Sequence, residues 1–170
     1  MEIILRKREV AKETPPVQPP IRLENDGCLE ISFIGAGSAF SKKHFQNNVL
    51  LVQGPSHVLV DCGSRAPEAL ALLGLSVTGI TTYLVTHSHA DHIGGLEEVM
   101  LQNRYRAHRR SRIILTDKMR HILWGTSLRG GAAFNEVHDG EPLRFEDFFE
   151  QLTPRRHRGA DRELSSIDEG

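Results

Sequence analysis

Four residues of the types that bind metal ions fall within six positions near the middle of this chain, and they constrain it more than any other feature. They begin two positions after the apolar run 83–85, and they are His87, His89, Asp91 and His92. Imidazole nitrogen and carboxylate oxygen are ligands that zinc, manganese and iron favour. A single histidine in an apolar setting is usually an ordinary core or surface residue. Four ligand-type residues at H-x-H-x-D-H spacing instead favour a metal site.

The same segment predicts how the ligands are placed. The apolar run indicates a buried strand that turns into a helix. Side chains alternate along an extended chain, so His87 and His89 are expected to point the same way, while Asp91 and His92 lie on the turn and face a second point nearby. This layout fits two metal ions a few ångströms apart.

Segment 86–92 resembles the T-H-x-H-x-D-H signature of the metallo-β-lactamase fold superfamily, and Ile-Gly-Gly-Leu at 93–96 is its usual continuation into a helix. Segment 31–40, Ile-Ser-Phe-Ile-Gly-Ala-Gly-Ser-Ala-Phe, resembles the first core strand and glycine-rich loop of the branch that contains ribonuclease Z and related phosphodiesterases. Segment 58–63 resembles the strand of that fold that ends in Asp-x-Gly. The match extends over about residues 30 to 125.

The resemblance implies two divalent metal ions, zinc first, with manganese or iron as alternatives. His87 and His89 would bind one ion, and Asp91 and His92 the other. Asp91 would also act in catalysis by orienting the attacking hydroxide. Asp61 would hold a ligand histidine in one tautomer, with Thr86 beside it. The alternative for Asp61, which we favour slightly less, is an ordinary strand-end turn carboxylate, and the alternative for Thr86 is simply the last strand residue.

The implied activity is metal-dependent hydrolysis by a metal-activated hydroxide. A phosphodiester is the expected bond, either an RNA 3′ end or a cyclic nucleotide. Two alternatives remain: hydrolysis of a thioester, lactone or lactam by the same fold, and a truncated, non-catalytic metal-binding fragment. No substrate-binding residue is predicted.

The resemblance also predicts the fold class, α/β (α+β), as the first half of an αββα sandwich. The later histidines and the bridging aspartate of the superfamily have no convincing counterparts here, and 153–170 is polar with no evident closing helix or strand pair. We therefore expect a leader over 1–27, extended or disordered and containing Pro-Pro pairs, followed by a metallo-β-lactamase-like domain over 28–170 that is truncated at its C-terminus.

Hydrophobic patterning predicts the elements of this domain. The expected strands are 29–34, 48–53, 57–61, 82–85 and 112–115. The expected helices are 66–73, 91 to about 104, 117–123 and 145–152. Glycines near Trp124 and at 130–131 indicate a flexible stretch between the last two helices.

Composition limits location and partners. The net charge of −1 gives no general attraction to nucleic acid or to anionic membranes, and the two cysteines lack metal-type or redox-type spacing. We expect a cytoplasmic homo-oligomer without a membrane segment, acting on a small hydrolysable substrate, with nucleic acid kept as an alternative. The basic run 104–112 has two alternative roles. It could steer a phosphodiester substrate toward the site, or it could be a solvated helix end and loop, which is the alternative we favour. The glycine-rich loop 35–39 approaches a ligand or is merely a turn.

Overall fold

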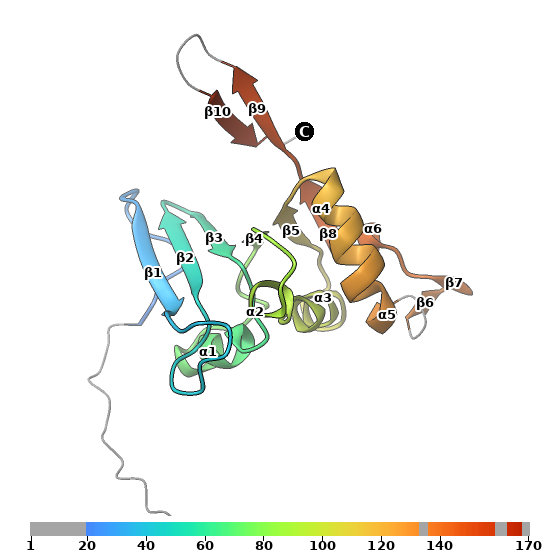
Figure 1. Ribbon diagram of the computed structural model, residues 1–170, viewed down its shortest axis with the longest axis horizontal. Coiled ribbons are helices and arrows are strands. Elements are labelled where there is room, and N and C mark those ends of the chain that lie inside the picture. Colours follow the sequence, from blue (N-terminus) through green and yellow to red (C-terminus); the bar gives the residue numbers. More distant parts are fainter. Residues whose placement is uncertain (1–19, 133–135, 159–162, 168–170) are drawn as a thin grey trace, which may run out of the picture.

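The centre of the structure is a six-stranded mixed β-sheet (Figure 1). The computed structural model describes residues 20–132, 136–158 and 163–167. Across the sheet the strands are β1 (Glu30–Gly35), β2 (Asn48–Gln53), β3 (Ser56–Val60), β4 (Thr82–Leu84), β5 (Ser111–Ile114) and β8 (Phe149–Leu152). The pairs β1–β2 and β2–β3 are antiparallel, whereas β3, β4, β5 and β8 run parallel. Parallel neighbours end at the same edge, so the residues that follow β3 and β4 emerge side by side.

Helices supply the crossovers that parallel strands require. α1 (Ala66–Leu72) joins β3 to β4, and α2 (Ala90–Ile93) and α3 (Leu96–Tyr105) join β4 to β5. α4 (Asp117–Ile122), the π-helical turn η1 (Leu123–Leu128), α5 (Arg129–Ala132) and α6 (Phe145–Phe148) precede β8. No helix among the described residues has the length and hydropathy needed to span a bilayer.

The hydrophobic core lies on one face of the sheet. Leu50, Leu59, Tyr83 and Ile113 stand in register across four neighbouring strands, and each side chain is fully buried. They form one cluster with the apolar residues of α1 and α3. The sheet and these helices are therefore held together mainly by burial of aliphatic and aromatic surface.

The other face of the antiparallel strands is apolar but open. Ile31 and Phe33 on β1 are 54% and 66% exposed, and they pair with Leu51 and Val49, which are only half-buried. Two-sheet sandwiches bury such a face against a second sheet about 10 Å away. This half of the sheet thus has the alternation of an inner sandwich layer.

His57 fastens the N-terminal segment to the sheet. Its Nδ1–H donates to the Leu23 carbonyl at 2.9 Å, and its Nε2 accepts from the Thr81 backbone N–H at 3.0 Å. Of the expected leader 1–27, residues 1–19 lie outside the described residues. Beyond that point Leu23 packs against the core, and Asn25 N–H donates to the Gly54 carbonyl.

The pairing of His57 predicts a pH-dependent stability. Burial lowers the pKa of His57 below its ordinary 6.5, because the charged ring loses hydration in this half-buried position, which outweighs the opposing effect of the backbone hydrogen bonds. The unfolded chain therefore takes up the proton first, and the contribution of His57 is lost as the pH falls below 6.5 toward the folded-state pKa. Denaturant titrations should show wild type losing its stability advantage over His57→Gln between pH 7.5 and pH 5. An advantage that is equal at both pH values would contradict this prediction.

The strand and helix predictions for 29–123 are confirmed to within one or two residues, except that Gly94 and Gly95 divide the predicted helix at 91–104 into α2 and α3. Three predictions for later residues are wrong. The predicted helix 145–152 is a single turn, α6, followed by a strand of the main sheet. The stretch 124–131 is helical. Residues past 153 contain a strand pair, β9 (Pro154–Arg158) and β10 (Glu163–Ile167). A further two-stranded hairpin joins β6 (Val137–His138) to β7 (Glu141–Pro142).

Candidate metal centre

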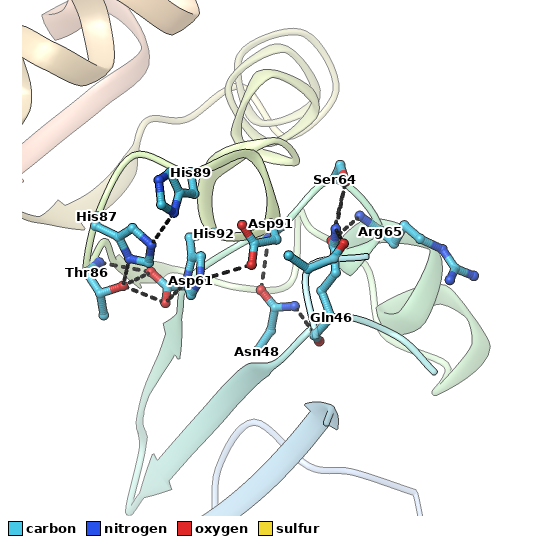
Figure 2. A network of polar contacts seen from close by, with 12 residues as sticks. Gln46, Asn48, Asp61, Ser64, Arg65, Thr86, His87, His89, Asp91 and His92 are labelled. Atoms are coloured by element: carbon cyan, nitrogen blue, oxygen red, sulfur yellow. Dashed lines mark hydrogen bonds and ion pairs between the residues drawn. The ribbon is translucent and has the colours of Figure 1, made fainter. Parts of the chain in front are cut away.

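The predicted ligands gather where β3 and β4 end. Val60 pairs with Leu84, and the Asp61 N–H donates to the Leu84 carbonyl at 2.8 Å. Asp61 therefore emerges beside the start of the motif, as Figure 2 shows. This placement at the carboxyl edge of parallel strands is where open α/β sheets build sites.

Asp61 has a buried carboxylate group and a strained backbone, and both of its carboxylate oxygens accept hydrogen bonds. Its φ is +62°, a left-handed conformation that aspartate tolerates better than most residues, and its side chain is 6% exposed. It accepts the Thr86 N–H at 2.9 Å, the Thr86 hydroxyl at 2.8 Å and His92 Nδ1–H at 2.6 Å. The carboxylate thus fixes His92 with its Nε2 lone pair free.

Thr86 extends the hydrogen-bond chain from Asp61 to the ring of His87. Its Oγ1 donates to Asp61, so it is available to accept from His87 Nδ1–H at 3.1 Å. That assignment leaves the lone pair on His87 Nε2, which lies 3.0 Å from His89 Nδ1. Asp61 therefore orients two of the three motif histidines, one directly and one through Thr86.

The four predicted ligands form two pairs. The first is His87 Nε2 with His89 Nδ1, and the second is His92 Nε2 with Asp91 Oδ2 at 3.2 Å. The rings of His87 and His92 are 3.9 Å apart between centroids, so the two pairs are adjacent. All four side chains remain at least partly open to solvent.

The donor atoms fit two half-sites for metal ions. Two ligands on one tetrahedral zinc ion stand about 3.3 Å apart, given zinc–nitrogen bonds near 2.0–2.1 Å, and both pairs lie close to that spacing. Within the part of the chain that the structure describes, no three His, Cys, Asp or Glu side chains form a group that could hold a metal ion. Among the described residues, each pair thus offers two donor atoms close together and not a closed set of ligands.

Three glycines hold the ligand turn against the loop after β3. Cys62 N–H donates to the His92 carbonyl at 2.7 Å, and Gly95 N–H returns a bond to the Cys62 carbonyl at 2.9 Å. A methyl group on Gly63 would collide with the Asp91 carbonyl oxygen, and one on Gly95 would lie 2.7 Å from the Gly63 carbonyl oxygen. Gly94 is similarly close to Ser64. Only glycine permits this close approach.

Two buried amides that were not predicted as site residues support the same loop. Asn48 Oδ1 accepts from Gly63 N–H at 2.9 Å, and Asn48 Nδ2 donates to the Gln46 carbonyl at 2.8 Å. Gln46 Oε1 accepts from Arg65 N–H at 3.1 Å (Figure 2). Asn48 is the first residue of β2, and nothing in the local sequence around the two amides indicates this supporting role.

The glycine-rich loop 35–39 uses its glycines for packing against its own returning arm. A methyl group on Gly37 would lie 2.7 Å from the Phe45 carbonyl oxygen, and one on Gly35 would collide with the Gln46 carbonyl. The Gly37 N–H donates to the Phe45 carbonyl at 2.6 Å. Of the two alternatives for this loop, the tight turn explains both glycines.

We predict that this chain alone binds zinc weakly. Two protein ligands leave each ion's coordination half open, so the dissociation constant should exceed about 1 μM, far weaker than for a closed structural site. Calorimetry on the 170-residue chain tests this. Two tightly bound zinc ions per monomer would contradict it, provided that sedimentation excludes ligands from a second copy.

Comparison with known proteins adds a family to this geometry. The family model for "Anti-Pycsar protein Apyc1" matches residues 29–167. A relative of that name from Paenibacillus sp. (strain J14) is 39% identical over 110 residues, covering 65% of this chain and 45% of the relative. One from Paenibacillus xerothermodurans is 44% identical over 103 residues, covering 61% and 41%. The chain thus spans less than half the length of these two relatives.

Solved structures agree on the fold. A diphosphatase of the PhnP family matches with a TM-score of 0.50 and 15% identity, over 81% of this chain and 61% of that one. The metallo-β-lactamase fold protein YhfI from Bacillus subtilis matches with a TM-score of 0.50 and 13% identity, over 82% and 56%. These likenesses confirm the predicted metallo-β-lactamase-type fold. With the family model spanning most of its length, the chain belongs to the Apyc1 family of anti-Pycsar proteins.

Proposed function

We propose that this protein is a metal-dependent phosphodiesterase that acts on small phosphodiesters such as cyclic nucleotides. The observation that carries the proposal is the convergence of two ligand pairs, His87 with His89 and Asp91 with His92, behind one orienting carboxylate. The phosphodiester preference is supported by the likeness of segment 31–40 to the phosphodiesterase branch of the superfamily.

The contacts of the basic run 104–112 favour a small substrate over RNA. Arg104 donates to the Asp147 carbonyl at 3.0 Å, Arg109 to the Thr78 carbonyl at 2.7 Å, and Arg110 to the Glu146 carbonyl at 3.1 Å. These guanidinium groups bind the protein's own backbone, and the net charge is −1. Because affinity for RNA depends largely on phosphate neutralisation, this surface is poorly suited to it.

Each residue of the site has a separate expected role in the reaction. Bound divalent ions would lower the pKa of water and neutralise charge developing on a phosphoryl group. His87 and His89 would hold one ion, and Asp91 and His92 the other. Asp61 keeps His92 Nδ1 protonated, so that Nε2 stays available as a ligand atom. Asp91 would also accept a hydrogen bond from the attacking water and orient it.

The test is hydrolysis of bis(p-nitrophenyl) phosphate and a 3′,5′-cyclic nucleotide by the full-length gene product. We expect turnover with zinc or manganese that is abolished by EDTA and by His89→Ala. His121→Ala, an exposed histidine on α4, is the matched control and should retain turnover. Turnover confined to thioesters, lactones or lactams, or none on any phosphodiester, would contradict the proposal.

A further inference from the structure

A pocket of about 550 Å³ opens beside the ligand pairs. His89 and Asp91 form part of its wall, so whatever it holds lies next to the proposed reaction centre. The rest of the wall comes from Ala90, from the loop between β1 and β2 and from residues 64–65. The volume lies within the 300–1,000 Å³ typical of small-molecule sites.

Phe40 presents an unused aromatic face at this pocket. Its side chain is 88% exposed, the most exposed of the large hydrophobic residues in the described chain. The loop that carries it is held by bonds from Ser41 N–H to the Ser38 carbonyl at 3.1 Å and from Asn47 N–H to the Gly37 carbonyl at 3.0 Å. A flat π surface on a fixed loop is a platform on which a nucleobase can stack.

The pocket also carries positive charge. Lys42 and Arg65 line it, and among the residues that the structure describes Asp91 is the only acidic one in its wall. The Arg65 guanidinium stacks 4.4 Å above the Phe45 ring and pairs with Glu68 at 3.3 Å, which holds it in place. An anionic group is therefore favoured in this pocket, with Lys42 as its mobile cationic contact.

Hydrogen bonds within the protein hold the wall of the pocket together. Gln46 is 6% exposed, and its Nε2 donates to the Ala39 carbonyl at 3.4 Å and to Ser64 Oγ at 3.2 Å. These bonds tie the loop that carries Phe40 to the loop that packs against Asp91 (Figure 2). A wall held by its own hydrogen bonds limits the entropy cost of ordering it on binding.

We infer that this pocket is the nucleoside subsite of the enzyme: a base stacks on Phe40, and an anionic phosphate oxygen contacts Lys42. The inference rests on the proposed function and adds its specificity-determining residue. The ligand class is a mononucleotide unit. A bound base would direct the phosphodiester toward His89 and Asp91.

Binding of two probes that share a phosphate tests the role of Phe40. We expect adenosine 5′-monophosphate to bind the full-length protein at least about tenfold more tightly than ribose 5-phosphate, because only the former carries a base. Phe40→Ala should remove that difference, and Phe40→Leu should remove most of it by abolishing the π face. Lys42→Ala should weaken both probes alike. Leu72→Ala, which removes an exposed apolar side chain of α1 outside the pocket, is the matched control.

Equal binding of the two probes to wild type, or an unchanged preference in Phe40→Ala, would overturn the inference. So would an effect of Leu72→Ala equal to that of Phe40→Ala. Turnover of a cyclic nucleotide in the same variants separates this from the proposed function. Turnover with an unchanged KM in Phe40→Ala contradicts the subsite alone, whereas base-dependent binding without any phosphodiester turnover contradicts the proposed function alone.

Discussion

Replacing Gly63 with alanine is expected to lower the free energy of unfolding by about 3 kcal/mol. Its Cβ would collide with the Asp91 carbonyl oxygen and lie 2.6 Å from Gln46 Oε1, and both neighbours are held by hydrogen bonds or by the ligand turn. This clash is relieved only if the loop after β3 and the turn that carries Asp91 move apart. Because a shift of about 1 Å at a reacting group can cost two orders of magnitude in rate, phosphodiester hydrolysis should fall about 100-fold.

Gly130→Ala is the matched control for this substitution. Gly130 lies within α5, and a methyl group there has no neighbour within 4 Å. Alanine is the better helix former, so this variant should be as stable as wild type or up to about 1 kcal/mol more stable. Chemical denaturation and initial rates measure both effects. Wild-type stability in Gly63→Ala would show that the close approach of the two loops is not required.

Asp61→Asn is expected to lower metal affinity and hydrolysis by about 10- to 100-fold with little change in shape. One carboxylate oxygen becomes an amide that donates rather than accepts. If that amide faces His92 Nδ1, the ring must carry its proton on Nε2 and cannot bind an ion through it. If the amide instead takes the place of Oδ1, it faces the Thr86 backbone N–H, so two donors oppose each other and the bond that holds Thr86 is lost.

Asp139→Asn is the control for Asp61→Asn. Asp139 also has a positive φ, +52°, but it is exposed and lies on the turn between β6 and β7. Asparagine tolerates this conformation as well as aspartate does, so any backbone effect of the substitution should be common to both variants. Competition with a chromophoric chelator measures zinc affinity. An equal loss in both variants would exclude the orienting role of the Asp61 carboxylate.

The strand and helix predictions for 29–123 succeeded because the local pattern and the tertiary structure agree there. Apolar runs bounded by turn residues became strands, and Ile93, Leu96, Val99 and Met100 are all buried, as one face of a helix requires. Gly74, at φ +77°, follows the end of α1. The position of the metal motif after β4 followed from the same strand assignment.

The segment 145–152 shows where local pattern fails. Phe145, Phe148, Phe149 and Leu152 have the i, i+3, i+4, i+7 spacing of a helix, yet 149–152 is a strand paired with β5. The backbone groups of β5 need a partner, and that long-range demand outweighs the helical pattern. In 123–132 burial of Leu123 likewise outweighs the cost of the helical glycines.

The parts of the site that the sequence did not reveal depend on long-range contacts. Asn48 and Gln46 act through carbonyl and amide partners up to 19 residues away, and an amide before a strand has no local signature of that role. The resemblance implied that Asp61 holds a ligand histidine, but the local pattern did not indicate its bond to His92, which joins residues 31 positions apart. Such contacts follow from the parallel pairing of β3 with β4 rather than from any motif.

Anomalous diffraction at the zinc edge from crystals soaked in zinc tests the central claim most directly. The account predicts density about 2.0–2.2 Å from donor atoms of His87 and His89, and a second peak at the same distance from Asp91 and His92. Zinc bound elsewhere, with these four side chains free of it, would contradict the assignment of this cluster as a metal centre.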